Sequence, residues 1–176
     1  MTLTDKVAFV TGGSRGIGLA SAKALVASGA SVAITGTDQS RIDSAVVSLG
    51  KNALGIRADV RKYSDVEGAL AQTVSQFGGL DIMINNAGSA AGGVIEHLTE
   101  DDWEKGLQLK FMGYVRCLKA ALPIMRAQGG GRVVNLIGND GVKESYWEIV
   151  PGAANAAGQN LTKALAGQYA RHGITF

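Results

Sequence analysis

Short apolar runs rich in β-branched residues alternate with longer amphipathic stretches along the whole chain of 176 residues. This alternation predicts a parallel sheet whose strands are joined by crossover helices. The expected strands are 6–11, 31–35, 53–57, 81–85 and 132–137, with a sixth that begins at 174. The expected helices are 16–28, 39–49, 64–77, 102–128 and 152–171.

A glycine-rich segment lies between the first expected strand and the first expected helix. It reads Thr11-Gly12-Gly13-Ser14-Arg15-Gly16-Ile17-Gly18. A diphosphate needs backbone N–H groups that point at it and no Cβ in the way, and such a turn at a helix N-terminus supplies both. Gly12, Gly16 and Gly18 would take these roles. The alternative is that the glycines only permit a tight turn and close helix packing.

Two further segments favour the binding interpretation. Asp59-Val60 follows the third expected strand, and Asn85-Asn86-Ala87-Gly88 follows the fourth. Both lie at the carboxyl ends of strands, where open α/β sheets bind ligands. The sequence thus places three polar or glycine-rich segments at one edge of the sheet.

Together these three segments closely resemble the short-chain dehydrogenase/reductase family, and the resemblance covers essentially the whole chain. It implies an α/β fold of the doubly wound Rossmann type, with a parallel sheet, helices on both faces and a bound NAD(P). It also implies that Asp59 lies near the adenine. The cofactor-binding residues implied are Gly12, Ser14, Arg15, Gly16, Ile17, Gly18, Asp59, Val60, Asn86, Ala87 and Gly88.

The choice between NAD and NADP depends on the end of the second strand, where an acidic residue would hold the ribose hydroxyls. That position is Gly36, and Arg15 is placed to pair with a 2′-phosphate, with Arg41 as a more distant helper. We therefore expect NADP. NAD stays possible because Asp38 stands two residues after Gly36, and the two arginines have an alternative role as solvated surface charges.

The same resemblance implies a catalytic set of Asn, Ser, Tyr and a Lys four residues after the Tyr, which together perform acid-base catalysis. Matching 131–135 forward assigns the Ser position to Gly138, and matching 173–176 backward assigns the Tyr and Lys positions to Pro151 and Asn155. In the helix that begins near Trp103, the Asn position falls on Lys110. All four residues differ from the family pattern. Gly138 would leave space where the Ser hydroxyl stands, so orienting a substrate would require backbone groups or Asn139.

Lys110 and Asn155 suggest a rearranged site, because the family's amide and amine have exchanged positions. We expect the two side chains to face each other across the cleft. Lys110 shares a helical face with Leu107, Phe111 and Tyr114, where a lysine is costly without a partner. The alternative is a Lys110 side chain that extends out to solvent.

The proton donor is harder to assign, because Pro151 has no ionisable group. Tyr146, in the loop 139–150, is the candidate expected to reach inward. Its alternative role is to form, with Trp147, an aromatic cover over the cleft. Other candidates in that loop are Asp140, Lys143 and Glu148.

Composition excludes several other functions. The net charge of +2 is too small for a nucleic-acid surface, and apolar runs end well before the roughly 18 residues that span a bilayer. The first six residues lead straight into a strand, and the single cysteine, Cys117, cannot form an internal disulfide. We therefore expect a cytoplasmic protein without a metal site, because no cluster has metal-ligand spacing.

We expect one NAD(P)-binding domain over 1–176 that is truncated at the start of the sixth strand, with the family's C-terminal substrate segment missing. The helices 102–128 and 152–171 correspond to the pair that family members pack into dimers and tetramers, so a homodimer or homotetramer is expected. The expected function is NAD(P)-dependent interconversion of a small-molecule carbonyl and alcohol by Lys110, Asn155 and Tyr146. The alternative is an inactive cofactor-binding protein that serves as a sensor or partner subunit.

Overall fold

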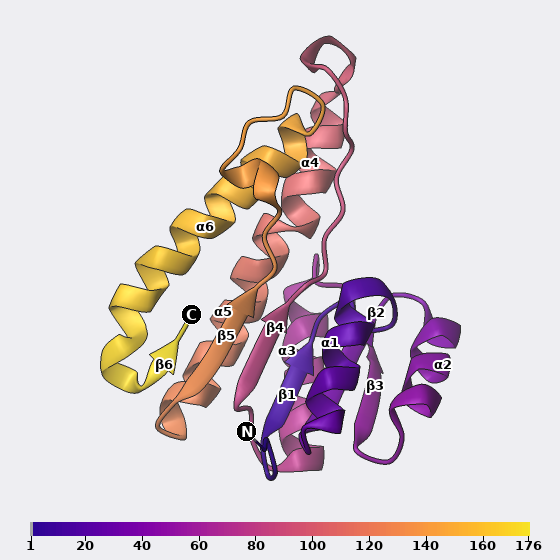
Figure 1. Ribbon diagram of the computed structural model, residues 1–176, viewed down its shortest axis with the longest axis vertical. Coiled ribbons are helices and arrows are strands. Elements are labelled where there is room, and N and C mark those ends of the chain that lie inside the picture. The colour runs from indigo at the N-terminus through magenta and orange to yellow at the C-terminus, as the bar shows by residue number, and fades with distance from the viewer. Residues whose placement is uncertain (1) are drawn as a thin grey trace.

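A central sheet of six parallel strands organises the chain, and the computed structural model describes it over residues 2–176 (Figure 1). The strand order is β3-β2-β1-β4-β5-β6. The strands are β1 (Val7–Val10), β2 (Ser31–Gly36), β3 (Ala53–Arg57), β4 (Ile82–Asn85), β5 (Gly131–Asn135) and β6 (Ile174–Thr175). The alternation of apolar runs and amphipathic stretches therefore predicted the parallel sheet with crossover helices correctly, and the doubly wound fold that the family resemblance implies is confirmed.

Helices cover both faces of the sheet. On one face, Ala22 and Ala45 pack with strand residues in a buried apolar cluster, and on the other face Leu70 and Leu118 do the same. The helices are α1 (Gly16–Ala27), α2 (Gln39–Leu49), α3 (Tyr63–Phe77), α4 (Glu100–Leu109), α5 (Phe111–Ala127) and α6 (Ile149–Tyr169). Within 2–176, none of these helices combines the length and the apolar character needed to cross a membrane.

The single helix expected over 102–128 is two helices that meet at Lys110. The backbone there has φ −84° and ψ −67°, which departs from regular helical values, although the Lys110 N–H still donates to the Gly106 carbonyl at 3.1 Å. At this junction the Arg116 guanidinium donates a hydrogen bond to the Gln108 carbonyl, at 3.1 Å. The Arg116 side chain thus supplies a hydrogen-bond donor to a carbonyl at the break. The continuous apolar pattern of the sequence did not indicate that the helix would break there.

The last helix, α6, begins at Ile149 rather than at the expected residue 152. Its first hydrogen bond runs from the Gly152 N–H to the Glu148 carbonyl, at 2.7 Å. Pro151 therefore lies in the first turn, where its missing N–H has no intrahelical partner to lose. Proline marks this helix start correctly, but it does not fix the first residue.

The path of the chain reverses at β1, which pairs with β2 on one side and β4 on the other. Val10 is aligned with Ile34 of β2 and with Ile84 of β4. The connections that leave these strands run in opposite directions, so a crevice opens at their carboxyl ends. The glycine loop that follows β1 lies at this point.

Candidate functional site

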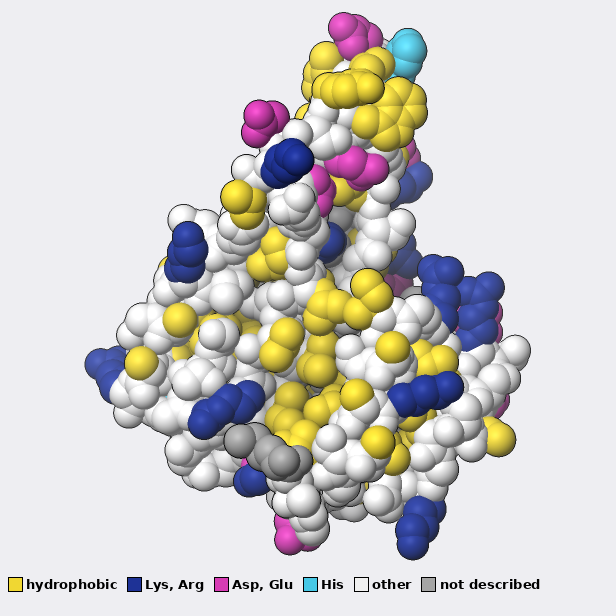
Figure 2. All heavy atoms as spheres, in the orientation of Figure 1, with side chains coloured by type: hydrophobic (Ala, Val, Ile, Leu, Met, Phe, Trp, Pro, Cys, Tyr) yellow, Lys and Arg dark blue, Asp and Glu magenta, His cyan; other side chains and the backbone are white. Residues whose placement is uncertain are grey.

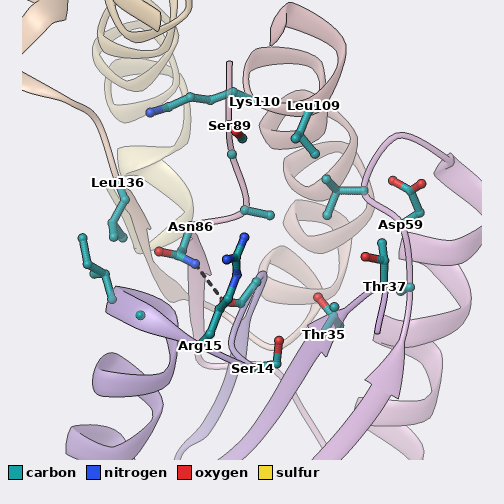
Figure 3. A pocket seen from close by; sticks show the side chains of 18 of the residues that line it. Ser14, Arg15, Thr35, Thr37, Asp59, Asn86, Ser89, Leu109, Lys110 and Leu136 are labelled. Atoms are coloured by element: carbon teal, nitrogen blue, oxygen red, sulfur yellow. Dashed lines mark hydrogen bonds between the residues drawn. The ribbon is translucent and has the colours of Figure 1, made fainter. Parts of the chain in front are cut away.

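A cleft of about 620 Å³ lies at the carboxyl ends of the strands, within the range of small-molecule sites (Figure 3). Ten of the eleven predicted cofactor residues line it, and Gly18 does not. Residues that the sequence did not single out also line it: Thr35, Thr37, Ser89, Leu109, Leu136 and Ile137. They could have been found from position, because most of them lie at or just after the end of a strand.

The three glycines of the loop are needed for different reasons. A Cβ on Gly18 would lie 2.3 Å from the Gly12 carbonyl oxygen, so Gly18 allows α1 to pack against the loop. Gly12 has a φ of +64°, and its Cβ would lie 2.9 Å from the Asn86 Nδ2. Gly16 has a φ of +54° and no atom within 4 Å of its Cβ position, so it faces open space. A ligand can therefore approach the backbone at Gly16, whereas Gly18 acts from behind the loop.

The N-terminus of α1 faces the cleft with its backbone donors available. The first hydrogen bond of this helix runs from the Leu19 N–H to the Arg15 carbonyl, at 3.1 Å. The N–H groups of Gly16 and Ile17 precede that bond, as the first donors of any helix do. The first turn contains no acidic residue to neutralise the positive end of the helix dipole. This arrangement suits a pyrophosphate.

Thr11 and Asn86 fasten the glycine loop to the segment that follows β4. The Asn86 Nδ2 donates to the carbonyls of Thr11 and Gly12, at 2.9 and 3.1 Å, and one of these bonds is drawn in Figure 3. The Thr11 hydroxyl accepts from the N–H groups of Asn86 and Ala87, both at 3.0 Å. Asn86 was predicted to line the cleft, and its amide also fixes the shape of the loop. Thr11 was missed, although a buried hydroxyl at the end of a strand was a usable signal.

The end of β2 carries no acidic side chain, and Ser14 lies close to it. A Cβ on Gly36 would lie 3.1 Å from the Ser14 Oγ, so a side chain there would press against that hydroxyl. Asp38 instead caps α2, where it accepts from the Arg41 N–H at 3.1 Å. The same carboxylate pairs with the Arg41 guanidinium at 3.2 Å. Arg15 has no such partner among residues 2–176, and Figure 3 shows its side chain directed into the cleft.

Asp59 lies at the other end of the cleft and is held by its neighbour Arg61. The Arg61 guanidinium donates to both carboxylate oxygens, at 2.6 and 2.9 Å for the two shortest contacts. These hydrogen bonds lower the pKa of Asp59 below its usual value, against the opposing effect of burial. Asp59 is therefore a fixed anion at the rim of the cleft.

Lys110, at the α4–α5 junction, is half-buried and lines the cleft. Its stem passes Gly88, where a Cβ would lie 3.0 Å from the Lys110 Cγ. Figure 3 shows its amine on the side of Leu136, opposite Asp59. Burial lowers the pKa of the amine, and the charge of Asp140 acts in the other direction. The side chain thus enters the cleft rather than extending away from it.

Asn155 contacts Asp140 rather than Lys110. Its Nδ2 donates to both carboxylate oxygens of Asp140, at 2.9 and 3.0 Å. The space expected beside Gly138 is filled: a Cβ there would lie 2.2 Å from the Asp140 Oδ1 and 2.6 Å from the Asn155 Nδ2. The expectation of an empty position at Gly138 was therefore wrong, because a carboxylate two residues further along the loop folds back into it.

The structure does not bring Tyr146 to the cleft. Its side chain is 82% exposed, and it lies outside the set of cleft-lining residues. Together with Ile95, Val142 and Trp147, it belongs to the exposed apolar side chains of the loops 88–99 and 139–148. Figure 2 shows hydrophobic side chains gathered at this tip of the molecule, beside a histidine. The two loops are joined there by a hydrogen bond from the Gly93 N–H to the Trp147 carbonyl, at 2.7 Å.

A family model described as short chain dehydrogenase matches residues 6–176. The chain belongs to the short-chain dehydrogenase family. An uncharacterised oxidoreductase of Staphylococcus epidermidis is 32% identical over 170 residues, which cover 97% of this chain and 74% of the relative. The 3-oxoacyl-(acyl-carrier-protein) reductase of Vibrio cholerae is 33% identical over 175 residues, which cover 99% and 72%. A crystal structure of NAD⁺-bound xylitol dehydrogenase matches with a TM-score of 0.95 and 29% identity, covering 99% of this chain and 68% of that one.

In this member of the short-chain dehydrogenase family, a chain of partly buried hydrogen bonds joins α6 to β4 and β5. The Asn85 Nδ2 donates to the Asn135 Oδ1 at 2.8 Å, and the Asn135 Nδ2 donates to the Thr162 Oγ1 at 2.9 Å. Thr162 in turn donates to the Gly158 carbonyl at 2.7 Å. Because β4, β5 and α6 are linked in this way, the position of Asn155 relative to the sheet is fixed.

Proposed function

We propose that this chain binds NADP and interconverts a carbonyl and an alcohol of a small molecule at the cleft, with Lys110 as the acid-base group. NAD is the second candidate cofactor. The observation that carries the proposal is Gly16, which faces open space at the N-terminus of α1. This is where a pyrophosphate would bind backbone N–H groups. Membership of the family and the likeness to an NAD⁺-bound dehydrogenase support a nicotinamide cofactor.

The residues present fit such a cofactor. The loop from Gly12 to Gly18 would hold the pyrophosphate, and Asp59 and Val60 would lie at the adenine end. When bound, the nicotinamide supplies or accepts the hydride. Lys110 would donate a proton to the carbonyl oxygen during reduction and take it from the hydroxyl during oxidation. Burial of the Lys110 amine lowers its pKa, so the neutral amine that accepts a proton is easier to form than at an exposed lysine.

Two features of the ribose end support NADP. Gly36 carries no acidic side chain and lies close to the Ser14 hydroxyl, and Asp38 is held by Arg41 at the start of α2. The carboxylate that could repel a 2′-phosphate is therefore already paired. Arg15 lines the same cleft and is free to pair with that phosphate.

Calorimetry with NADPH and NADH, followed by turnover on a panel of carbonyls and alcohols, tests the proposal. We expect NADPH to bind more tightly and at least one substrate to be converted. Lys110→Met should abolish turnover and leave NADPH affinity within about twofold, because the amine lies away from the loop that grips the phosphates. Lys105→Met is the matched control, since Lys105 is exposed on α4 and pairs with Asp101. Absence of saturable binding of either nucleotide would overturn the proposal.

A second function is favoured by one observation: Tyr146 is exposed, so no tyrosine from its loop reaches the cleft. A cofactor-binding protein that acts as a sensor or partner subunit is consistent with this. The same experiment separates the two, because nucleotide binding without any turnover across the panel supports the second function and excludes the enzyme.

A further inference from the structure

Asp140 is a charged side chain to which the reaction outlined above gives no role. It lies in the short 3₁₀ turn Asn139–Gly141, directly after the cleft-lining residues Leu136 to Gly138. Its carboxylate is turned back toward the cleft, because it occupies the place where a side chain on residue 138 would stand. A charged group on an exposed turn normally points to water, so this inward placement calls for a cause.

The Asn155 amide supplies that cause. Asn155 is 2% exposed and donates from one nitrogen to both oxygens of Asp140, at 2.9 and 3.0 Å. Its own Oδ1 is buried without a hydrogen-bond partner among the described residues. A buried amide oxygen accepts a donor at little cost, so the pair has unused capacity for an ammonium or hydroxyl.

Lys110 lines the same cleft as Gly138, and Figure 3 shows its amine on the side of Leu136, two residues before Gly138. Gly88 of the segment after β4 lies against its stem, and one turn along α5 the Tyr114 hydroxyl donates to the Leu136 carbonyl at 2.7 Å. The other charged side chains of the loop 139–148 are exposed, namely Lys143, Glu144 and Glu148. Within residues 2–176, no carboxylate lies within 4 Å of the Lys110 amine. The Asp140 carboxylate, which lies beside Gly138, raises the pKa of that amine through its charge, against the larger effect of burial.

We propose that Asp140 is a positioning residue of this site: its carboxylate, held beside Gly138 by the Asn155 amide, is the counter-ion of the Lys110 ammonium. The proposal rests on the function proposed for Lys110, but it concerns the charge of the amine rather than turnover. It gives the amide at position 155 a definite task, which is to hold a carboxylate. It also explains why residue 138 is a glycine, because any Cβ there would displace the carboxylate.

The two effects on Lys110 have opposite signs. Burial favours the neutral amine, and the Asp140 carboxylate favours the ammonium. Removing the carboxylate charge leaves burial unopposed, so the titration midpoint of Lys110 must move to lower pH. Displacing the carboxylate without removing it must have the same sign and a smaller size, because Coulomb energy falls with distance.

The test is a titration of the full chain whose lysines carry ¹³C-methyl groups introduced by reductive methylation, followed by NMR. The Lys110 resonance is assigned by its loss in Lys110→Met. Asp140→Asn, which keeps the shape and the contact with Asn155, should shift the Lys110 midpoint to lower pH. Gly138→Ala should shift it in the same direction by less. Glu144→Gln is the matched control, because it removes a carboxylate from an exposed position in the same loop.

A Lys110 midpoint that is unchanged or moves to higher pH in Asp140→Asn would overturn the proposal. An equal downward shift in Glu144→Gln would also overturn it, because the effect would then reflect net charge alone. If Gly138→Ala unfolds, as judged by its thermal transition, Asp140→Asn and its control decide the outcome. Failure of turnover does not affect this result, since the midpoint is measured without substrate; the two proposals can therefore fail separately.

Discussion

The two sides of the cleft are fixed in different ways. On the side of β1 and β4, the glycine loop is held by backbone geometry and by the Thr11–Asn86 clamp, with a Cβ excluded at Gly12 and Gly18. On the side of β5 and α6, the polar groups are side chains that contact one another, namely Asp140 and Asn155. Backbone geometry tolerates few residue types, whereas a side-chain cluster can be rebuilt from several.

This difference explains how the chain can resemble its family so closely in one half of the site and depart from it in the other. The loop at the start of α1 must admit a pyrophosphate to the backbone, and only glycine meets that need at Gly16. At the α4–α5 junction and after β5, an amine, a carboxylate and an amide stand where the resemblance implies an amide, a hydroxyl and an amine. We therefore expect changes on the first side to affect nucleotide binding together with stability, and changes of the charged and amide groups on the second side to affect chemistry more than nucleotide binding.

Gly18→Ala should have the largest effect. The added Cβ would lie 2.3 Å from the Gly12 carbonyl oxygen and 2.5 Å from the Asn86 Nδ2, so α1 or the loop must shift. Overpacking of this kind costs about 3 kcal/mol of unfolding free energy. NADPH affinity should fall more than tenfold, because the donors at Gly16 and Ile17 would move with the loop. Urea unfolding and calorimetry measure the two effects.

The control for that change is Gly68→Ala in α3, where no atom lies within 4 Å of the Cβ position. Because alanine is the better helix former, this variant should gain up to about 1 kcal/mol and bind NADPH like the wild type. If Gly18→Ala were as stable as Gly68→Ala and bound NADPH like the wild type, backbone geometry at Gly18 would not be what fixes the glycine loop.

Thr11→Val tests the hydrogen bonds by which Thr11 holds the segment after β4, and it changes the shape of the side chain little. Thr11 is 1% exposed, and its hydroxyl accepts from the N–H groups of Asn86 and Ala87 at 3.0 Å. Valine leaves both donors buried without this partner, which should cost about 2 kcal/mol in urea unfolding. Thr37→Val, at an exposed position, should leave the unfolding free energy within about 0.5 kcal/mol. A Thr11→Val protein as stable as the wild type would show that Thr11 does not hold the loop.

Local patterns predicted much of the fold. The strands were found because β-branched apolar runs ended at glycine or polar residues, and the observed bounds differ from the expected ones by no more than two residues. The break at Lys110 was not predictable, because the apolar stripe continues through it and the Arg116 contact with Gln108 depends on the folded junction. The start of α6 was misplaced because proline fits more than one position of a first turn.

The same distinction between local sequence patterns and contacts made only in the folded chain applies to the site. Ten of the eleven cofactor positions line the cleft because a strand end followed by glycine is a local signal. The contact of Asn155 with Asp140 joins residues 15 positions apart on different elements, and no spacing rule announces it. Tyr146 illustrates the reverse error: a suitable chemical group in a nearby loop was expected to turn inward, but the loop carries it to the outer tip.

The smallest expected effect concerns Asp59, at the end of the cleft opposite Lys110. Hydrogen bonds from Arg61 lower the pKa of Asp59 in the folded chain, so ionised Asp59 favours the fold. That stabilisation is complete above the carboxyl's unfolded pKa and is lost as the pH falls through the lower, folded pKa. Arg61→Gln should raise the folded pKa toward its ordinary value. Its unfolding free energy should therefore lie below that of the wild type at neutral pH and converge with it in acid.

The difference at neutral pH should be less than about 1 kcal/mol, because the Arg61 side chain is 53% exposed and solvent screens the pair. Arg126→Gln, at an exposed position in the last turn of α5, removes the same charge without touching Asp59. Urea unfolding across the acid range should show the converging curves for Arg61→Gln and a constant offset for Arg126→Gln. If both variants kept a constant offset from the wild type, the Arg61 hydrogen bonds would not be what keeps Asp59 ionised. The Asp59 carboxylate at this end of the cleft would then be ionised because it is exposed to solvent.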